Sequence, residues 1–180
     1  MRTPLKEEHS FTEKGSAVLF FSRYYSSPDG PRPVLPAHVL FAIMLVEPNL
    51  LQVCSGVEAD KIATGLNDDL AAYSCSDRRE WFSPEIASLS VPAQAVVELA
   101  AAEAKRFGQT DIGPEHLLLA LCDVASGVTD PDRAVVVEAL HRRGITSNII
   151  TEKIESGAIR LAHDTFRAAS RLVGRHWSRA

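Results

Sequence analysis

Residues 112–121 read Ile-Gly-Pro-Glu-His-Leu-Leu-Leu-Ala-Leu, and residues 34–42 read Val-Leu-Pro-Ala-His-Val-Leu-Phe-Ala. Without a gap, an offset of 78 residues superposes the second stretch on the first. The same register aligns further pairs along the chain: Phe11 with Leu89, Thr12 with Ser90, Ala17 with Ala95, Gly30 with Gly108, Pro36 with Pro114 and His38 with His116. Chance rarely gives a shared Pro-x-His-x-Leu-x-Ala pattern in register, so we predict two copies of one repeat.

Each copy has the pattern of a helical unit. Thr12 and Ser90 are good N-cap residues, because their hydroxyls accept hydrogen bonds from the first turn. Pro36 and Pro114 suit the first helical position, where a missing N–H costs nothing. The helices that they open, 37–46 and 115–122, are apolar nearly all round. Such helices belong in the middle of a core.

Two more helices are predicted in each copy. In copy one they lie near 49–55 and 58–73, and in copy two near 132–143 and 147–156. The helix near 132–143 is preceded by Asp130-Pro131, an N-cap residue followed by a first-turn proline. The register changes to 88 at Gly56 and Gly144, so copy two contains ten extra residues, placed around 123–133. The fold class predicted is all-α, with two tandem four-helix repeats that share a core.

The predicted organisation has five parts. An N-terminal arm covers residues 1–9, repeat one covers 10–73, a polar linker covers 74–84 and repeat two covers 85–156. Residues 157–180 form a separate basic segment. This segment is set apart by charge: residues 158–180 carry five arginines and one aspartate, whereas residues 1–157 carry 14 Lys/Arg and 22 Asp/Glu.

The basic segment is expected to be an amphipathic helix. Its apolar residues fall on one face and its arginines on the other: Ile159, Ala162, Phe166, Val173 and Trp177 against Arg160, Arg167, Arg171, Arg175 and Arg179. Three roles stay open for it. The apolar face packs on the acidic body, or it mediates dimerisation, or the helix binds an acidic partner, nucleic acid or an anionic membrane.

Composition narrows the class of protein. The chain is 46% hydrophobic and 23% charged, a normal globular balance, with a net charge of −4. Cys54, Cys75 and Cys122 are far apart and form no CxxC pair, which fits a reduced cytosolic protein without a zinc or disulfide framework. The N-terminus is polar and the longest apolar run, 39–46, is too short to span a bilayer. We therefore expect a cytoplasmic protein.

The repeat resembles a known family. Phe-Thr-Glu-Lys-Gly-Ser-Ala-Val-Leu at 11–19 is similar to the opening of the N-terminal domain repeat of Clp unfoldases of the ClpC/ClpA type. The stretch at 112–121 resembles the central Ile-Gly-Thr-Glu-His-Leu-Leu-Leu signature of that domain. The resemblance implies an eight-helix domain with pseudo-two-fold symmetry that binds adaptors, substrates or peptide-like ligands. In the family this domain usually precedes ATPase rings. No glycine here is followed by lysine, so the chain has no phosphate-binding P-loop and is expected to be a stand-alone domain.

The resemblance also implies a ligand site. In ClpC-type members each repeat can hold a phosphorylated arginine, with the Glu before the signature His on the guanidinium and the repeat-opening Thr near the phosphate. Glu115 and Ser90 match these positions in copy two. Thr12 matches in copy one, but Ala37 replaces the Glu, so at most one site is expected to survive. The alternative for Glu115 is a first-turn acid favoured by the helix dipole.

The other candidate residues have structural interpretations. His38 and His116 are expected to be buried and hydrogen-bonded, fixing the starts of their helices. The paired carboxylates Asp68 and Asp69 are expected to be solvated. No metal or cofactor is expected. There is no G-x-S-x-G elbow or supported Cys/His pair, so the chain is not expected to be an enzyme.

Three functional hypotheses follow from the sequence. The first is an accessory, adaptor or decoy factor of the Clp chaperone–protease system, whose partners are Clp ATPase or protease components, adaptors or substrates. The second is a module that sequesters phosphoarginine-marked proteins or peptide ligands. The third is a nucleic-acid-linked regulator that uses the arginine-rich tail. The protein is expected to be a monomer or a homodimer.

Overall fold

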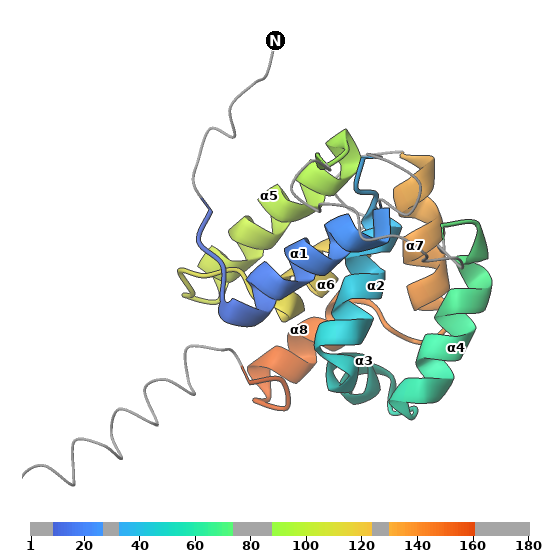
Figure 1. Ribbon diagram of the computed structural model, residues 1–180. Coiled ribbons are helices and arrows are strands. Elements are labelled where there is room, and N and C mark those ends of the chain that lie inside the picture. Colours follow the sequence, from blue (N-terminus) through green and yellow to red (C-terminus); the bar gives the residue numbers. More distant parts are fainter. Residues whose placement is uncertain (1–8, 27–32, 74–87, 124–129, 161–180) are drawn as a thin grey trace, which may run out of the picture.

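The computed structural model describes residues 9–26, 33–73, 88–123 and 130–160, which form helices joined by short connections (Figure 1). Repeat one contains α1 (Glu13–Ser26), α2 (Pro36–Val46), α3 (Pro48–Ser55), α4 (Ala59–Asp69) and a short 3₁₀ turn, η1 (Ala71–Tyr73). Repeat two contains α5 (Val91–Arg106), α6 (Pro114–Cys122), α7 (Pro131–His141) and α8 (Ser147–Glu155). The prediction of an all-α fold with four helices in each copy is confirmed.

The helix starts follow from capping chemistry. The Ser90 hydroxyl accepts a hydrogen bond from the Ala93 N–H at 3.3 Å, and the Thr12 hydroxyl accepts one from the Gly15 N–H at 3.0 Å. The Asp130 carboxylate accepts from two first-turn N–H groups of α7. Each interaction satisfies a backbone donor that an α-helix leaves unpaired at its start. The predicted caps at these three residues are confirmed.

The two repeats exchange their opening segments. Phe11 forms a parallel β-bridge with Ile112, and Leu89 forms one with Val34. In the first bridge, the Thr12 N–H donates to the Ile112 carbonyl at 3.1 Å. In the second, the Ser90 N–H donates to the Val34 carbonyl at 2.9 Å. The offset of 78 residues converts one bridge into the other, as pseudo-two-fold symmetry requires.

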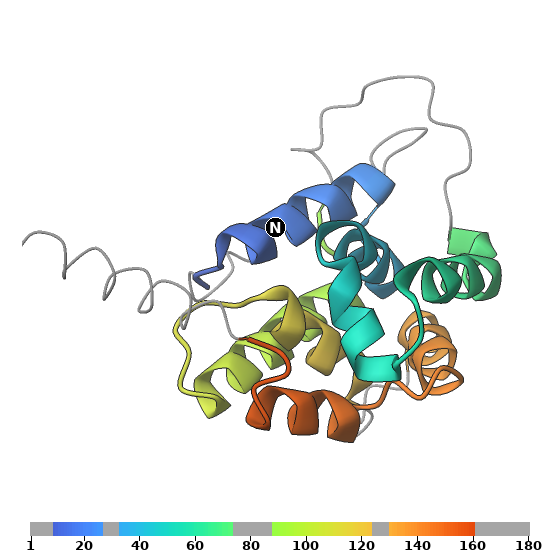
Figure 2. The same ribbon diagram turned by 90° about the horizontal axis from the view of Figure 1, so that it is seen from below.

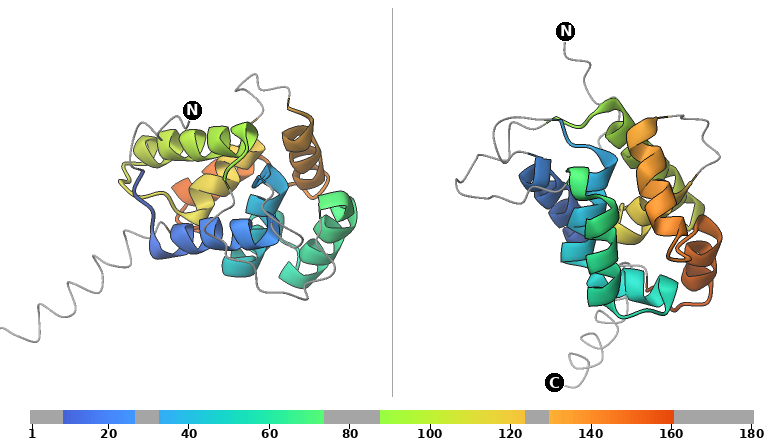
Figure 3. Two further views of the ribbon diagram at one scale, coloured as in Figure 1. Left: turned by 45° about the horizontal axis from the view of Figure 1, so that its top comes forward. Right: turned by 90° about the vertical axis from the view of Figure 1, so that its right-hand side faces the viewer.

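Helices α2 and α6 form the centre of the domain. Figure 3 (left) shows them between α1 on one side and α5 on the other. Leu40 and Leu118 are wholly buried, as the apolar pattern predicts. His38 and His116 are buried too, and each Nδ1 accepts a backbone N–H three residues earlier, from Leu35 and Gly113 respectively, at 3.1 and 3.0 Å. The predicted role of both histidines at the helix starts is confirmed.

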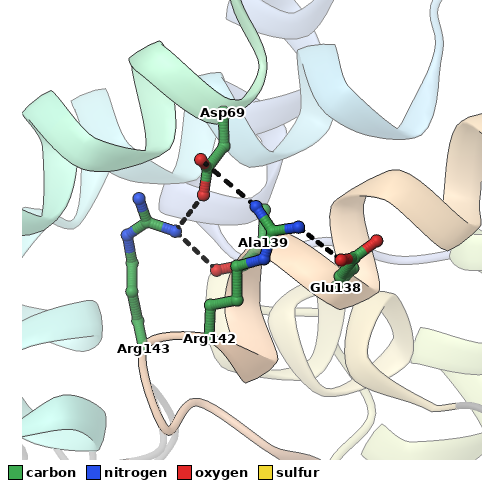
Figure 4. A network of polar contacts seen from close by, with 5 residues as sticks. All are labelled: Asp69, Glu138, Ala139, Arg142 and Arg143. Carbon is green, nitrogen blue, oxygen red and sulfur yellow. Dashed lines mark hydrogen bonds and ion pairs between the residues drawn. The ribbon is translucent and has the colours of Figure 1, made fainter.

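The outer helices also pair between repeats. Helix α3 lies beside α8, and α4 lies beside α7 (Figure 2). At the second contact the Arg143 guanidinium donates to Asp69 Oδ2 at 2.6 Å and to the Ala139 carbonyl at 2.7 Å, while Arg142 lies 3.6 Å from Asp69 and pairs with Glu138 (Figure 4). Asp69 is exposed, as expected of this acidic pair, but it also joins the repeats. The hydrogen bond from Arg143 lowers the pKa of Asp69.

The extra residues of copy two lie mainly in one connection. Glu47 alone separates α2 from α3, whereas residues 123–130 separate α6 from α7. Register is restored at Gly56 and Gly144, which both have a left-handed backbone with φ of 72° and 71°. Only glycine adopts this conformation without strain, so equivalent chain reversals follow α3 and α7.

Some predicted segments lie outside the described residues: most of the N-terminal arm, the linker 74–84, Gly30 and the basic segment from residue 161 onward. The sequence predicts that repeat two begins at residue 85. Its opening residue Leu89 forms a β-bridge with Val34 of repeat one, so the start of repeat two packs against the other repeat. Among the described helices, no single one is both long and apolar enough to cross a membrane. Among these described helices, α2 and α3 have the required length and apolar composition only when taken together, and they meet at 96°.

Candidate functional site

A cavity of about 720 Å³ opens between the two repeats. Its wall comes from the N-terminal end of α1, the junction of α2 and α3, the start of α6 and the chain after α8. The lining residues that carry charge are Glu13, Lys14, Glu47, Asp111, Glu115 and Arg160. Polar and apolar residues complete it, among them Thr12, Asn49, Leu50, Val53, His116 and Ile159.

Glu115 is the deepest charged group of this wall. It lies in the first turn of α6, only 6% of its surface is exposed, and its Oε1 has no hydrogen-bond partner. Burial raises its pKa to about 7, and the nearby charge of Glu47 adds to the shift. A backbone N–H and Lys14 act in the opposite direction. A buried carboxylate oxygen without a hydrogen bond is costly, so Oε1 is a strong acceptor for a donor that enters the cavity.

The Glu115 carboxylate folds back over Gly113. A Cβ atom on Gly113 would lie less than 3.0 Å from both carboxylate oxygens and from the carboxyl carbon. The equivalent positions in repeat one are Leu35 and Ala37, the latter fully buried. Repeat one therefore lacks both the carboxylate and the space that holds it.

His116 stays neutral beside this carboxylate. Burial lowers its pKa to about 4, and its Nδ1 already accepts the Gly113 N–H. The 3.5 Å approach of Nδ1 to Glu115 Oε1 therefore brings two acceptors together and is not an ion pair. The Nε2 atom of His116 is buried without a partner. The imidazole thus offers no compensation for the unpaired Glu115 oxygen.

The structure brings Glu115 together with Thr12, from the opposite repeat. The exchange of opening segments causes this, because Thr12 is bound to the residue that starts the α6 motif, Ile112. Ser90 does not line the cavity; its backbone is bound to Val34 at the equivalent place in the other half. The family resemblance assigns Glu115 and Ser90 of copy two to one site. In the structure, Glu115 instead shares the cavity with Thr12 of copy one.

Four charged lining residues were missed from the sequence: Glu13, Lys14, Glu47 and Asp111. Lys14 and Glu47 form an ion pair with each other in this lining. Lys14 follows Thr12 closely in the repeat-opening motif, a signal that could have identified it. Glu47 had no such signal, because it stands in the one-residue connection between α2 and α3.

Of the predicted tail residues, only Arg160 is described, and it lines the cavity. Phe166, Arg167, Arg171, Arg175 and Trp177 lie outside the described residues. Within the described part of the chain, no group of three or more His, Cys, Asp or Glu side chains could hold a metal ion.

Comparisons with known proteins give the same fold. The family model of the Clp repeat (R) N-terminal domain matches residues 10–131. The N-terminal domain of the caseinolytic protease associated chaperone ClpD from Arabidopsis thaliana is 23% identical, with a TM-score of 0.54, covering 82% of this chain and 94% of that one. The Hsp104 N-terminal domain from Candida albicans is 16% identical, with a TM-score of 0.58 and coverages of 80% and 88%. Among curated proteins, none matches.

Proposed function

The chain belongs to the Clp repeat (R) N-terminal domain family, and from this premise we propose that it is a non-catalytic protein-binding module, an accessory factor of the Clp chaperone–protease system. Its action would be that of an adaptor, of a decoy that competes for marked substrates or adaptors, or of a stabiliser that docks on the ring. The observation that carries the proposal is the cavity between the repeats, where the buried Glu115 has an oxygen without a partner.

The cavity suits a cationic group on a flexible protein segment. A guanidinium matches a carboxylate better than an ammonium does, because its planar donors can bond both oxygens at once. The N-terminal end of α1 provides positive potential close to Thr12, whereas the nearby charge of Lys14 is paired with Glu47. This arrangement supports a second, finer candidate, the sequestration of proteins that carry phosphoarginine.

The first test is capture of partners by the full chain. We expect wild-type protein to retain Clp components or their substrates, and Glu115→Gln to lose most of them. Glu98→Gln is the matched control, since Glu98 is an exposed acid of α5 that does not line the cavity. Retention of no Clp component by wild type, or equal retention by all three proteins, would contradict the proposal.

The second test is calorimetry with free phosphoarginine. We expect binding by wild type and by Glu98→Gln, and about ten- to hundredfold weaker binding by Glu115→Gln, because a lost charge-assisted hydrogen bond costs about 1.5–3 kcal/mol. Equal affinity for all three proteins would remove Glu115 from the site. The third hypothesis, nucleic-acid binding through the tail, remains a prediction, and a flat salt dependence with duplex DNA would end it.

A further inference from the structure

The chain leaves its last described helix along the wall of the cavity. After α8, the Ile159 N–H donates to the Lys153 carbonyl at 2.9 Å, and the Ile159 side chain is only 7% exposed. Ala158, Ile159 and Arg160 all line the cavity. The buried isoleucine therefore holds Arg160, the last described residue, at the wall of the cavity that Glu115 also lines.

The cavity and that segment carry opposite charge. Four carboxylates line the cavity, from Glu13, Glu47, Asp111 and Glu115. Lys14 and Arg160 are the lining cations, and Lys14 is already paired with Glu47. Segment 161–180 contains one acid, Asp164, no lysine, and four arginines: Arg167, Arg171, Arg175 and Arg179.

The arginines of the segment are within reach. Arg167 follows Arg160 by seven residues, which span up to about 23 Å when extended at roughly 3.3 Å per residue. A short tether also gives an effective concentration in the millimolar range. A weak contact between one guanidinium and a carboxylate is therefore enough to populate a docked state.

We propose that segment 161–180 of the same chain docks in this cavity and places an arginine guanidinium against the Glu115 carboxylate. The guanidinium supplies the donor that Oε1 of Glu115 lacks in the described part of the chain. An external cationic ligand must then displace the segment. The competition with an external ligand rests on the proposed function. The docking of the segment does not depend on it.

Paramagnetic broadening in the full-length protein tests the docking. A nitroxide on Ser170→Cys, in a chain with Cys75→Ser, labels the segment; Cys54 and Cys122 are buried and react poorly. We expect selective broadening of the amide signals of Thr12, Lys14 and Gly113. The matched control carries the same label with all four arginines changed to glutamine, and we expect the broadening to be lost there.

Two outcomes would overturn the proposal. One is broadening that is absent from the labelled chain or unchanged in the glutamine control. The other comes from a mixture in which the isotope-labelled chain carries no nitroxide and the nitroxide is on unlabelled chains. Broadening in this mixture that equals the broadening within a single labelled chain would be intermolecular. That result would assign the segment to a second copy.

Affinity for phosphoarginine gives an independent measurement. We expect the four-glutamine variant to bind free phosphoarginine roughly two- to tenfold tighter than wild type, because the competing segment is gone. Equal or weaker binding by this variant contradicts competition. If no variant binds phosphoarginine, that ligand fails as a candidate, and the broadening experiment alone decides the docking.

Discussion

The carboxylate of Glu115 lies over the α-carbon of Gly113, in the space that the first side-chain atom of any other residue would fill. The backbone of Gly113 has a φ of −101°, which every residue adopts, so space and not conformation requires glycine here. The pseudo-equivalent Leu35 precedes Ala37, where no carboxylate needs that room. The position of the Glu115 carboxylate therefore depends on the absence of a side chain at Gly113.

Gly113→Ala is expected to displace the Glu115 carboxylate and to weaken phosphoarginine binding by about ten- to hundredfold, the loss expected for one charge-assisted hydrogen bond. Calorimetry measures this effect, and thermal unfolding verifies that the variant is folded. Glu115→Gln and the double variant complete the cycle. If Gly113 acts through Glu115, the double variant should be no weaker than Glu115→Gln alone; additive losses would show a separate role.

The pH dependence of stability should report Glu115. Its pKa rises from 4.5 to about 7 on folding, so between these values the folded state binds more protons than the unfolded state. The free energy of unfolding then falls as pH rises from about 4.5 to about 7, by about 3 kcal/mol from this group alone. Urea unfolding at several pH values measures the slope.

Glu115→Gln should remove that part of the slope and be the more stable protein at pH 8. Glu98→Gln, an exposed change of equal charge, should keep the wild-type slope. The affinity for a cationic ligand should change in the opposite sense and rise with pH through about 7, because binding favours the ionised carboxylate. A slope equal in wild type and Glu115→Gln would contradict the burial argument.

Thr12→Ala and Ser90→Ala separate capping from binding. Both hydroxyls accept a first-turn N–H, so each variant should lose about 1 kcal/mol of stability. Only Thr12 lines the cavity, so only Thr12→Ala should weaken ligand binding. Equal loss of binding in the two variants would restore the pairing of Ser90 with Glu115.

Arg143→Ala should destabilise the domain more than Arg142→Ala. The Arg143 side chain is 19% exposed and bonds both Asp69 and the Ala139 carbonyl, which joins α4 to α7 (Figure 4). Arg142 is 59% exposed, and such surface pairs add little. Melting temperatures at low and high salt measure the loss of stability in each variant. The difference in melting temperature between the two variants should become smaller at high salt but should persist. Equal effects would show that the Asp69–Arg143 contact does not join the repeats.

Much of the fold could be predicted from the sequence because the chain contains two copies of the same repeat. Thr12 and Ser90, and likewise Pro36 and Pro114, mark the same helix starts independently, and each confirms the other. The same equivalence cannot show which copy contacts which. Thr12 and Ser90 are interchangeable in an alignment, whereas only three-dimensional exchange brings Thr12 to Glu115. The contribution of Glu47 was hidden for a related reason, because one residue between two helices carries no periodic signal.

The bridge between Phe11 and Ile112 also has a consequence for biosynthesis. About one hundred residues separate its two sides, so during translation the opening segment of the first repeat cannot pair until residue 112 has left the ribosome. Such non-local pairing slows folding and leaves apolar surface exposed in the meantime. The nascent first repeat would itself be a client for molecular chaperones until the second one is made.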